Sequence, residues 1–167
     1  MLDEILGGMD KELSALLRAE YAKRGIKFML STKVVSLAEA SSEDGKPQVQ
    51  VNFENAEGTG SVLAEKLLMS VGRRPVTKGF GLENLELKRT ERGNICTNEQ
   101  MQASAPGVYI CGDLTGYSLL AHTAVREAEV AVHTILGKKD VMSYWAIPGV
   151  VYTNPEIAGV GQTEESL

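Results

Sequence analysis

The residues best suited to chemistry in this chain are an acid and a helix start that follow one apolar run. The run Gly107-Val-Tyr-Ile-Cys-Gly-Asp113 ends in an acid, and Leu120-Ala-His122 opens a helical pattern soon afterwards. Open α/β sheets bind ligands where a strand ends beside a helix N-terminus. There a carboxylate can accept hydrogen bonds from ribose or ribityl hydroxyls, and the helix can stabilise negative charge on a phosphate or flavin ring. The alternative is an ordinary turn, because Gly-Asp is common turn chemistry.

Other common site motifs are absent from the sequence. Three Gly-x-Gly pairs occur, but none continues into the Gly-x-Gly-x-x-Gly phosphate loop between a strand and a helix. His122 and His133 lack acidic or cysteine partners at metal-ligand spacing, and Cys96 and Cys111 form no CxxC pair. We therefore expect no metal site and no catalytic residue. We interpret both cysteines as reduced structural thiols, and we expect Cys111 to be buried in a strand and inert. His133, near the end of a helix, is expected to interact with the negative end of the helix dipole.

Composition narrows the class of protein further. The chain has 167 residues, 43% hydrophobic and 23% charged, which is typical of a globular protein. Its net charge of -5 argues against a general nucleic-acid binder. It contains neither an apolar run long enough to span a membrane nor the basic start of a signal peptide.

Two helices and several strands should position the candidate site. Asp10 is a good N-cap for a helix that Gly25 ends, and a second helix is predicted over about 120–136, ended by Gly137. Strands are predicted at 26–30, 33–38, 48–53 and near 61–63, and the last three should form an antiparallel meander. The continuous apolar run at 66–71 predicts a central strand buried on both faces. The stretch 77–106 is expected to be a connector of short strands and turns.

Five segments of the sequence resemble the FAD-dependent pyridine nucleotide-disulfide oxidoreductases. Gly-Arg-Arg-Pro at 72–75 and Gly-Asp at 112–113 are shared across that superfamily. The combination of Met-Leu-Asp at 1–3, Leu-Ala-His at 120–122 and Tyr-Thr-Asn-Pro-Glu at 152–156 is more specific to its dihydrolipoamide dehydrogenase branch. The resemblance covers essentially the whole chain, in the family's order.

The resemblance implies an α/β fold assembled from parts of several domains. Residues 1–72 match the later part of an NAD-binding domain, 73–143 the second segment of an FAD-binding domain, and 144–167 the start of an α+β dimerisation domain. The first two are Rossmann-like and carry the antiparallel meander. In such an internal fragment, the two phosphate loops and the redox cysteines would lie upstream. The catalytic His-Glu dyad would lie downstream and come from the partner subunit.

The resemblance also assigns cofactor contacts by position. Asp113, with Gly112, would bind the ribityl chain of FAD. A backbone and helix-dipole contact with the flavin pyrimidine edge would come from Leu119, Leu120, Ala121 and His122. Contacts with NAD would come from Gly72 and, more weakly, Val34. The family often has Met where Leu119 stands, and Tyr117-Ser118 departs from its usual Gly-Pro, which leaves the conformation of that loop open.

The resemblance implies that the intact enzyme oxidises dihydrolipoamide and passes electrons through a disulfide and FAD to NAD+. The chain alone is expected to be inactive. Two alternatives stay open: a non-catalytic module that self-associates, and a fragment of a glutathione or mercuric reductase. The implied partners are a second subunit and the lipoyl domains of 2-oxo acid dehydrogenase complexes, and neither a nucleic acid nor a membrane is expected as a partner. The implied location is the cytoplasm, or the mitochondrial matrix in a eukaryote. We also expect self-association, because Ile147, Val150, Val151 and Tyr152 lack cover.

Overall fold

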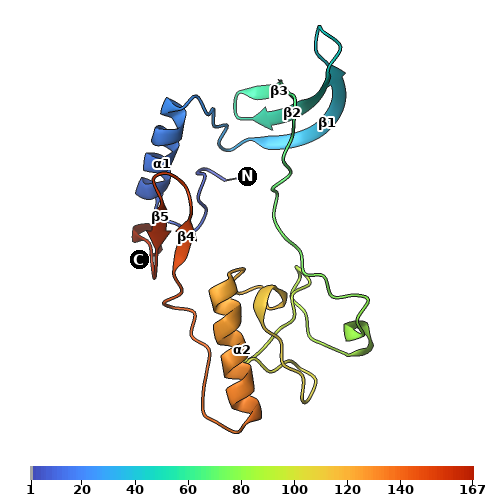
Figure 1. Cartoon of the computed structure of the whole chain (residues 1–167), viewed down its shortest axis with the longest axis vertical. Coiled ribbons are helices and arrows are strands. Elements are labelled where there is room, and N and C mark those ends of the chain that lie inside the picture. The colour runs from blue at the N-terminus through green and yellow to red at the C-terminus, as the bar shows by residue number, and fades with distance from the viewer. Residues whose placement is uncertain (1) are drawn as a thin grey trace. The chain divides into compact units, whose positions relative to one another are not determined.

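The computed structural model describes residues 2–167, so Met1 of the Met-Leu-Asp motif lies outside the described residues. The chain divides into two compact units (Figure 1). The first contains the described residues up to Ser70 together with Pro148–Leu167, and the second is Val71–Ile147. Neither α-helix in the described part of the chain combines the length and apolar character needed to cross a bilayer.

The first unit begins with the predicted helix. Helix α1 spans Lys11–Lys23, and the side chain of its N-cap Asp10 accepts a hydrogen bond from the backbone N–H of Glu12 at 2.9 Å. Such a cap satisfies one of the N–H groups that the first turn leaves without a partner. After the helix, Gly25 adopts a φ of 87°, a conformation that glycine reaches without strain. The predicted start and end are both confirmed.

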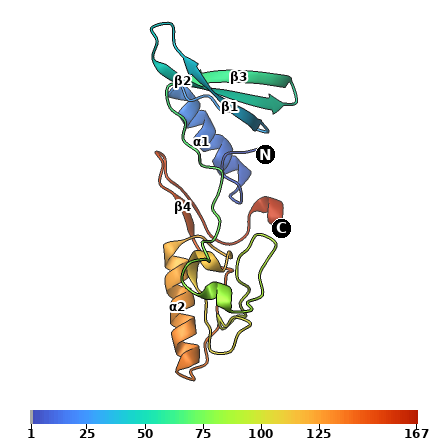
Figure 2. The same ribbon diagram turned by 90° about the vertical axis from the view of Figure 1, so that its right-hand side faces the viewer.

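An antiparallel three-stranded sheet follows and confirms the predicted meander. Its strands are β1 (Lys33–Ser41), β2 (Pro47–Asn55) and β3 (Gly58–Ala64), in that order, and Figure 2 shows the sheet from one side. Gly45, with a φ of 78°, turns the chain between the first two strands. A short antiparallel pair completes the unit, formed by β4 (Gly149–Val151) and β5 (Ile157–Gly159). The guanidinium of Arg24, after α1, donates to the carbonyl of Asn154 between them at 2.9 Å.

Two other predicted strands are wrong. Residues 26–30 and 66–71 form no strand, although both are rich in apolar side chains. Leu68 and Val71 are 88% and 87% exposed, so the predicted burial on both faces is wrong as well. A strand needs a neighbour for its backbone N–H and C=O groups, and these segments have no paired strand among residues 2–167.

The second unit is built on one helix and a small core. Helix α2 spans Ala121–Ile135, with Leu120 as N-cap and Leu136 as C-cap, and Gly137 follows with a φ of 72°. This confirms the predicted helix and its end. The core packs buried side chains from the helix, the connector and the segment after the helix: Met101, Val130, Ala131 and Met142, with Tyr109, Tyr144 and Ile147 against them. Ile147 is therefore partly covered, contrary to expectation, whereas Tyr152 in the first unit is 83% exposed.

The apolar run before the candidate acid is not a strand. Residues 107–111 carry only an isolated bridge, between Tyr109 and Gln102, and Gly112–Leu114 form the short 3₁₀ helix η2. Cys111 is exposed, so its predicted burial is also wrong. The pKa of its thiol is nevertheless raised, first by partial burial and then by the nearby charge of Glu127, which disfavours the reactive thiolate.

The connector before this run contains short elements, as predicted. They are the 3₁₀ helix η1 (Leu82–Asn84) and an isolated bridge between Arg89 and Ile95. Ile95 is fully buried, so the connector contributes to the interior of the unit. A last 3₁₀ helix, η3 (Glu164–Ser166), lies near the end of the first unit.

Candidate cofactor-binding cleft

The turn that carries Asp113 is held by hydrogen bonds on its buried side. The N–H of Gly112 donates to Oε2 of Glu127 at 2.5 Å, and the N–H of Thr115 returns to the carbonyl of Gly112 at 3.0 Å. Gly112 is buried with a φ of 73°, and a side chain there would meet Cβ of Ala124 at 3.4 Å. The buried glycine lets the turn pack on α2 and leaves Asp113 exposed beside it.

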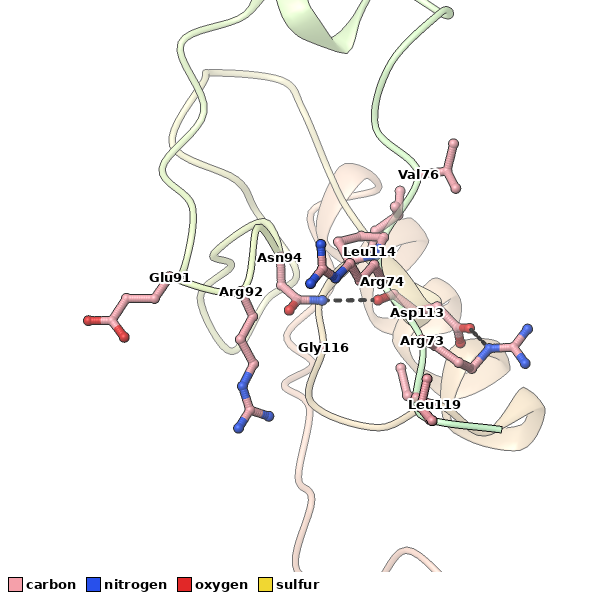
Figure 3. Close-up of a pocket in the computed structure, with 13 residues that line it drawn as sticks. Arg73, Arg74, Val76, Glu91, Arg92, Asn94, Asp113, Leu114, Gly116 and Leu119 are labelled. Carbon is pink, nitrogen blue, oxygen red and sulfur yellow. Dashed lines mark hydrogen bonds and ion pairs between the residues drawn. The ribbon is translucent and has the colours of Figure 1, made fainter. Parts of the chain in front are cut away.

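Asp113 faces a cleft of about 960 Å³ within the second unit. Figure 3 shows its side chain and that of Arg73 pointing toward each other, with Asp113 Oδ2 at 3.7 Å from Arg73 Nε. On the other side of the turn, Nδ2 of Asn94 donates to the carbonyl of Asp113 at 3.3 Å. The lining residues are Val71, Gly72, Arg73, Arg74, Pro75, Val76, Glu91, Arg92, Asn94, Asp113, Leu114, Gly116 and Leu119.

The cleft carries more positive than negative charge. Three arginines line it, Arg73, Arg74 and Arg92, against the carboxylates of Glu91 and Asp113. The side chains of Arg73 and Asp113 are 76% and 54% exposed, and an ion pair this long in solvent is weak. The carboxylate of Asp113 is therefore available to accept hydrogen bonds from a ligand hydroxyl, beside cations that suit an anionic ligand.

The start of α2 adds a second feature that suits a negatively charged group. Leu119 lines the cleft, Leu120 precedes the first helical turn, and no side chain caps that turn. The positive end of the helix dipole is consequently not offset by a capping carboxylate or hydroxyl. Gly116 lets the loop before the helix pack against Asn94, since a side chain there would meet Nδ2 of Asn94 at 2.5 Å.

The structure brings some of the predicted site residues together. Gly72, Asp113 and Leu119 line one cleft, with Gly112 behind the turn and Leu120, Ala121 and His122 at the adjoining helix start. Val34, the other residue matched to NAD contacts, lies 56% exposed on β1 in the other unit. The two predicted NAD contacts, Gly72 and Val34, thus belong to different units.

Three residues that line or support the cleft were not predicted from the sequence. Asn94 and Arg92 come from the connector, where no periodicity marks them. Glu127 is fully buried behind the turn. A signal for Glu127 did exist, because it shares a helical face with Thr123, Val130 and Ala131, all of which are buried.

The loop after α2 is tied back to the helix by Asp140. Its carboxylate takes two hydrogen bonds from the guanidinium of Arg126, at 2.6 and 2.9 Å, and lies 2.7 Å from Nδ1 of His133. These two partners, Arg126 first, lower the pKa of Asp140 to about 2. His133 does sit in the last helical turn, and its ring contacts this carboxylate.

The donors and acceptors of the cleft define what it can hold. An exposed carboxylate, an uncapped helix start and three arginines fit a ligand that combines sugar hydroxyls with anionic groups, as dinucleotide cofactors do. Residues 2–167 contain no cluster of three potential metal ligands. Fold and cleft together define the class as an α/β protein with a site suited to a nucleotide-type cofactor.

Comparison with known proteins identifies the family. Residues 1–128 match the profile of the family described as pyridine nucleotide-disulphide oxidoreductase. The chain is 43% identical over 166 residues to a dihydrolipoyl dehydrogenase of Thermus scotoductus, covering 98% of this chain and 35% of that protein. It is 36% identical over 160 residues to the human mitochondrial dihydrolipoyl dehydrogenase, covering 96% and 31%. This chain belongs to the pyridine nucleotide-disulphide oxidoreductase family.

Solved structures agree with this assignment. The crystal structure of LpdA from Mycobacterium tuberculosis matches with a TM-score of 0.83 and 26% identity, over 96% of this chain and 33% of that one. The flavoprotein disulfide reductase RclA of Escherichia coli, in a Cu(II) complex, matches with a TM-score of 0.84 at 23% identity, over 98% and 36%, and shows the fold alone. The α/β fold class predicted from the sequence is confirmed. The chain spans about a third of the length of the curated relatives it matches.

Proposed function

We propose that this chain is the part of a dihydrolipoyl dehydrogenase that supplies the ribityl and flavin side of the FAD site. The observation that carries the proposal is the exposed carboxylate of Asp113, which lies in η2 beside an arginine-lined cleft. The names of the relatives support the lipoamide enzyme over a glutathione or mercuric reductase. In the intact enzyme, two electrons from the dithiol of dihydrolipoamide would reduce a protein disulfide, and bound FAD would relay them from there to NAD+.

The residues of this chain would bind and orient the cofactor. The carboxylate of Asp113 would accept hydrogen bonds from ribityl hydroxyls. The first turn of α2, at Leu120, Ala121 and His122, would place positive potential against the pyrimidine edge of the flavin and favour the negatively charged reduced ring. Gly72 lines the cleft, and the space into which a side chain there would point is open. The family resemblance also matches Gly72 of the second unit and, more weakly, Val34 of the first to positions that would contact NAD.

The chain by itself should not turn over substrate. Its sequence carries neither the paired cysteines that would exchange with lipoamide nor a Gly-x-Gly-x-x-Gly phosphate loop. The test is a titration of the purified chain with FAD, followed by quenching of flavin fluorescence, together with an assay of NADH formation from dihydrolipoamide. We expect weak binding without turnover. Asp113→Asn should weaken binding about tenfold, because it replaces hydrogen bonds to a charged group, worth about 1.5–3 kcal/mol, by neutral ones worth about 0.5–1.5 kcal/mol.

A matched control separates the site from general effects of charge removal. Asp44→Asn removes one carboxylate from the β1–β2 turn of the other unit, where Asp44 pairs with Lys46 at 2.6 Å. FAD affinity should be unchanged in this variant. An equal loss of affinity in both variants, or lipoamide-dependent NADH formation by the unmodified chain, would contradict the proposal.

A second candidate, a non-catalytic module that self-associates, is favoured by one observation. Large apolar side chains of both units are exposed: Leu68 at 88%, Tyr152 at 83% and Trp145 at 77%. Exposed apolar groups of this size often mark an interface. Light scattering across a range of concentrations tests it, because a dimer with no response to FAD would favour this candidate. In the first proposal, dimerisation and binding of lipoyl domains belong to the intact enzyme.

A further inference from the structure

A carboxylate with no contact to solvent lies directly behind the turn that carries Asp113. Glu127, on the inner face of α2, is 0% exposed. Moving a carboxylate out of water is costly unless its oxygens accept several hydrogen bonds. None of the ion pairs among residues 2–167 includes Glu127. Its hydrogen-bond partners therefore have to offset that cost.

Those partners come from two segments on either side of the helix. Oε2 of Glu127 accepts the N–H of Gly112 at 2.5 Å. Oε1 accepts the hydroxyl of Tyr144 at 2.7 Å and lies 3.3 Å from Oγ1 of Thr115. The same Oγ1 lies 3.0 Å from the carbonyl oxygen of Gly112, so the hydroxyl of Thr115 can serve either acceptor. One side chain thus joins the turn before α2 to the segment after it.

Tyr144 is placed so that its hydroxyl donates to Glu127 at 2.7 Å, a much shorter contact than the one to its alternative acceptor, a sulfur. Its ring lies 4.9 Å from that of Tyr117, and its phenol is also 4.0 Å from the sulfur of Met101. Burial, followed by the hydrogen bond to Glu127, raises the pKa of Tyr144 above its ordinary value, which keeps the hydroxyl protonated. The donor on this side of Glu127 is consequently present at all ordinary pH values.

We propose that Glu127, supported by Tyr144, is a positioning residue that fixes the Gly112–Thr115 turn and thereby aims Asp113 at the cofactor. The N–H that Glu127 accepts belongs to the residue immediately before Asp113. Glycine adopts positive and negative φ about equally readily, so the hydrogen bond from the N–H of Gly112 to Glu127 favours the observed φ of 73° over the alternatives. The carbonyl of Asp113 is anchored separately by Asn94. With the backbone held on both sides of its Cα, the side chain of Asp113 leaves the turn from a fixed position beside the cleft. The cofactor part of this inference rests on the proposed function.

Three substitutions and a control separate positioning from a general contribution to folding. Glu127→Ala removes every acceptor. Glu127→Gln keeps one carbonyl oxygen for Gly112 and turns its amide toward two hydroxyl oxygens that can accept. Tyr144→Phe keeps the ring and removes one donor. The matched control is Glu129→Gln on the same helix, where the side chain is 56% exposed and pairs with Arg126, away from the turn.

The first measurement is the amide proton of Gly112 in the ¹⁵N-labelled chain. A short hydrogen bond to a carboxylate should place this signal far downfield and protect it from exchange. We expect Glu127→Ala to move it upfield and remove the protection, Glu127→Gln and Tyr144→Phe to have intermediate effects, and Glu129→Gln to have none. A Gly112 signal that is unchanged in Glu127→Gln and Glu127→Ala would overturn the inference. If Glu127→Ala does not fold, the Gln and Phe variants decide it.

The second measurement is FAD affinity in the same variants. We expect Glu127→Ala to weaken binding about tenfold, with partial rescue by Glu127→Gln, because the carboxylate of Asp113 loses its alignment. In the double variant, adding Glu127→Ala to Asp113→Asn should cause little further loss of FAD affinity, because the effects of two residues that act through one contact are not additive. Unchanged affinity or full additivity would overturn the positioning role and leave the proposed function standing. If FAD binds to no variant and not to the unmodified chain, the proposed function fails, whereas the Gly112 signal still decides whether Glu127 fixes the turn.

Discussion

Replacing Gly116 with alanine should destabilise the second unit by an amount that the structure allows us to divide into two parts. Gly116 has a φ of 75°, and a Cβ there would lie 2.5 Å from Nδ2 of Asn94. The left-handed conformation costs an alanine about 1–2 kcal/mol. Displacing Asn94 would also break its hydrogen bond to the carbonyl of Asp113, worth about 0.5–1.5 kcal/mol. The expected total is therefore about 1.5–3.5 kcal/mol.

A second glycine in the same unit isolates the backbone part of this cost. Gly137 has a φ of 72°, but no atom lies within 4 Å of the position that a Cβ would occupy. Gly137→Ala should cost only about 1–2 kcal/mol. Urea denaturation followed by circular dichroism measures both free energies of unfolding. Equal costs for the two variants would refute the argument that the loop before α2 packs tightly against Asn94. Adding Asn94→Ala to Gly116→Ala should recover part of the loss.

Three further predictions concern other parts of the chain. Asp140 has a pKa of about 2 against an ordinary 3.8, so the stability it contributes is present above about pH 4 and lost as pH falls toward 2. In Asp140→Asn, the unfolding temperature should therefore fall less between pH 4 and pH 2 than in the unmodified chain. Because the pKa of Cys111 is raised, it should react with iodoacetamide more slowly than an ordinary exposed thiol at the same pH, and Glu127→Gln should speed the reaction, as mass spectrometry would show. Asp10→Ala should lower stability by about 1 kcal/mol through loss of the α1 cap, and no loss of helix stability by circular dichroism would contradict this.

Local signals in the sequence were sufficient where a single segment determines its own structure. The N-cap Asp10 and the terminal Gly25 mark α1 because they satisfy or end the helical hydrogen bonds locally. The turn around Gly45 and the alternation of residues 48–53 predict the meander, since adjacent strands pair through short turns. In the same way, Gly137 marks the end of α2.

Local signals failed where structure depends on a distant partner. The apolar runs at 26–30, 66–71 and 107–113 read as strands, but no paired strand forms in any of them, and Leu68 is 88% exposed. Apolar content indicates a tendency to be buried and does not supply the neighbouring strand. At the site, Asp113 could be predicted from its position before a helix. Asn94 and Arg92 could not, because only the folded connector brings them to the cleft.

The central claim is that Asp113 and the start of α2 form one side of an FAD site. The most direct measurement is an FAD titration of the ¹⁵N-labelled chain, read as changes in backbone amide signals. We predict the largest changes at Asp113 and at residues 119–122, with the changes reduced in Asp113→Asn. Signals at these positions that stay unchanged at millimolar FAD, or that respond equally in Asp113→Asn, would contradict the claim.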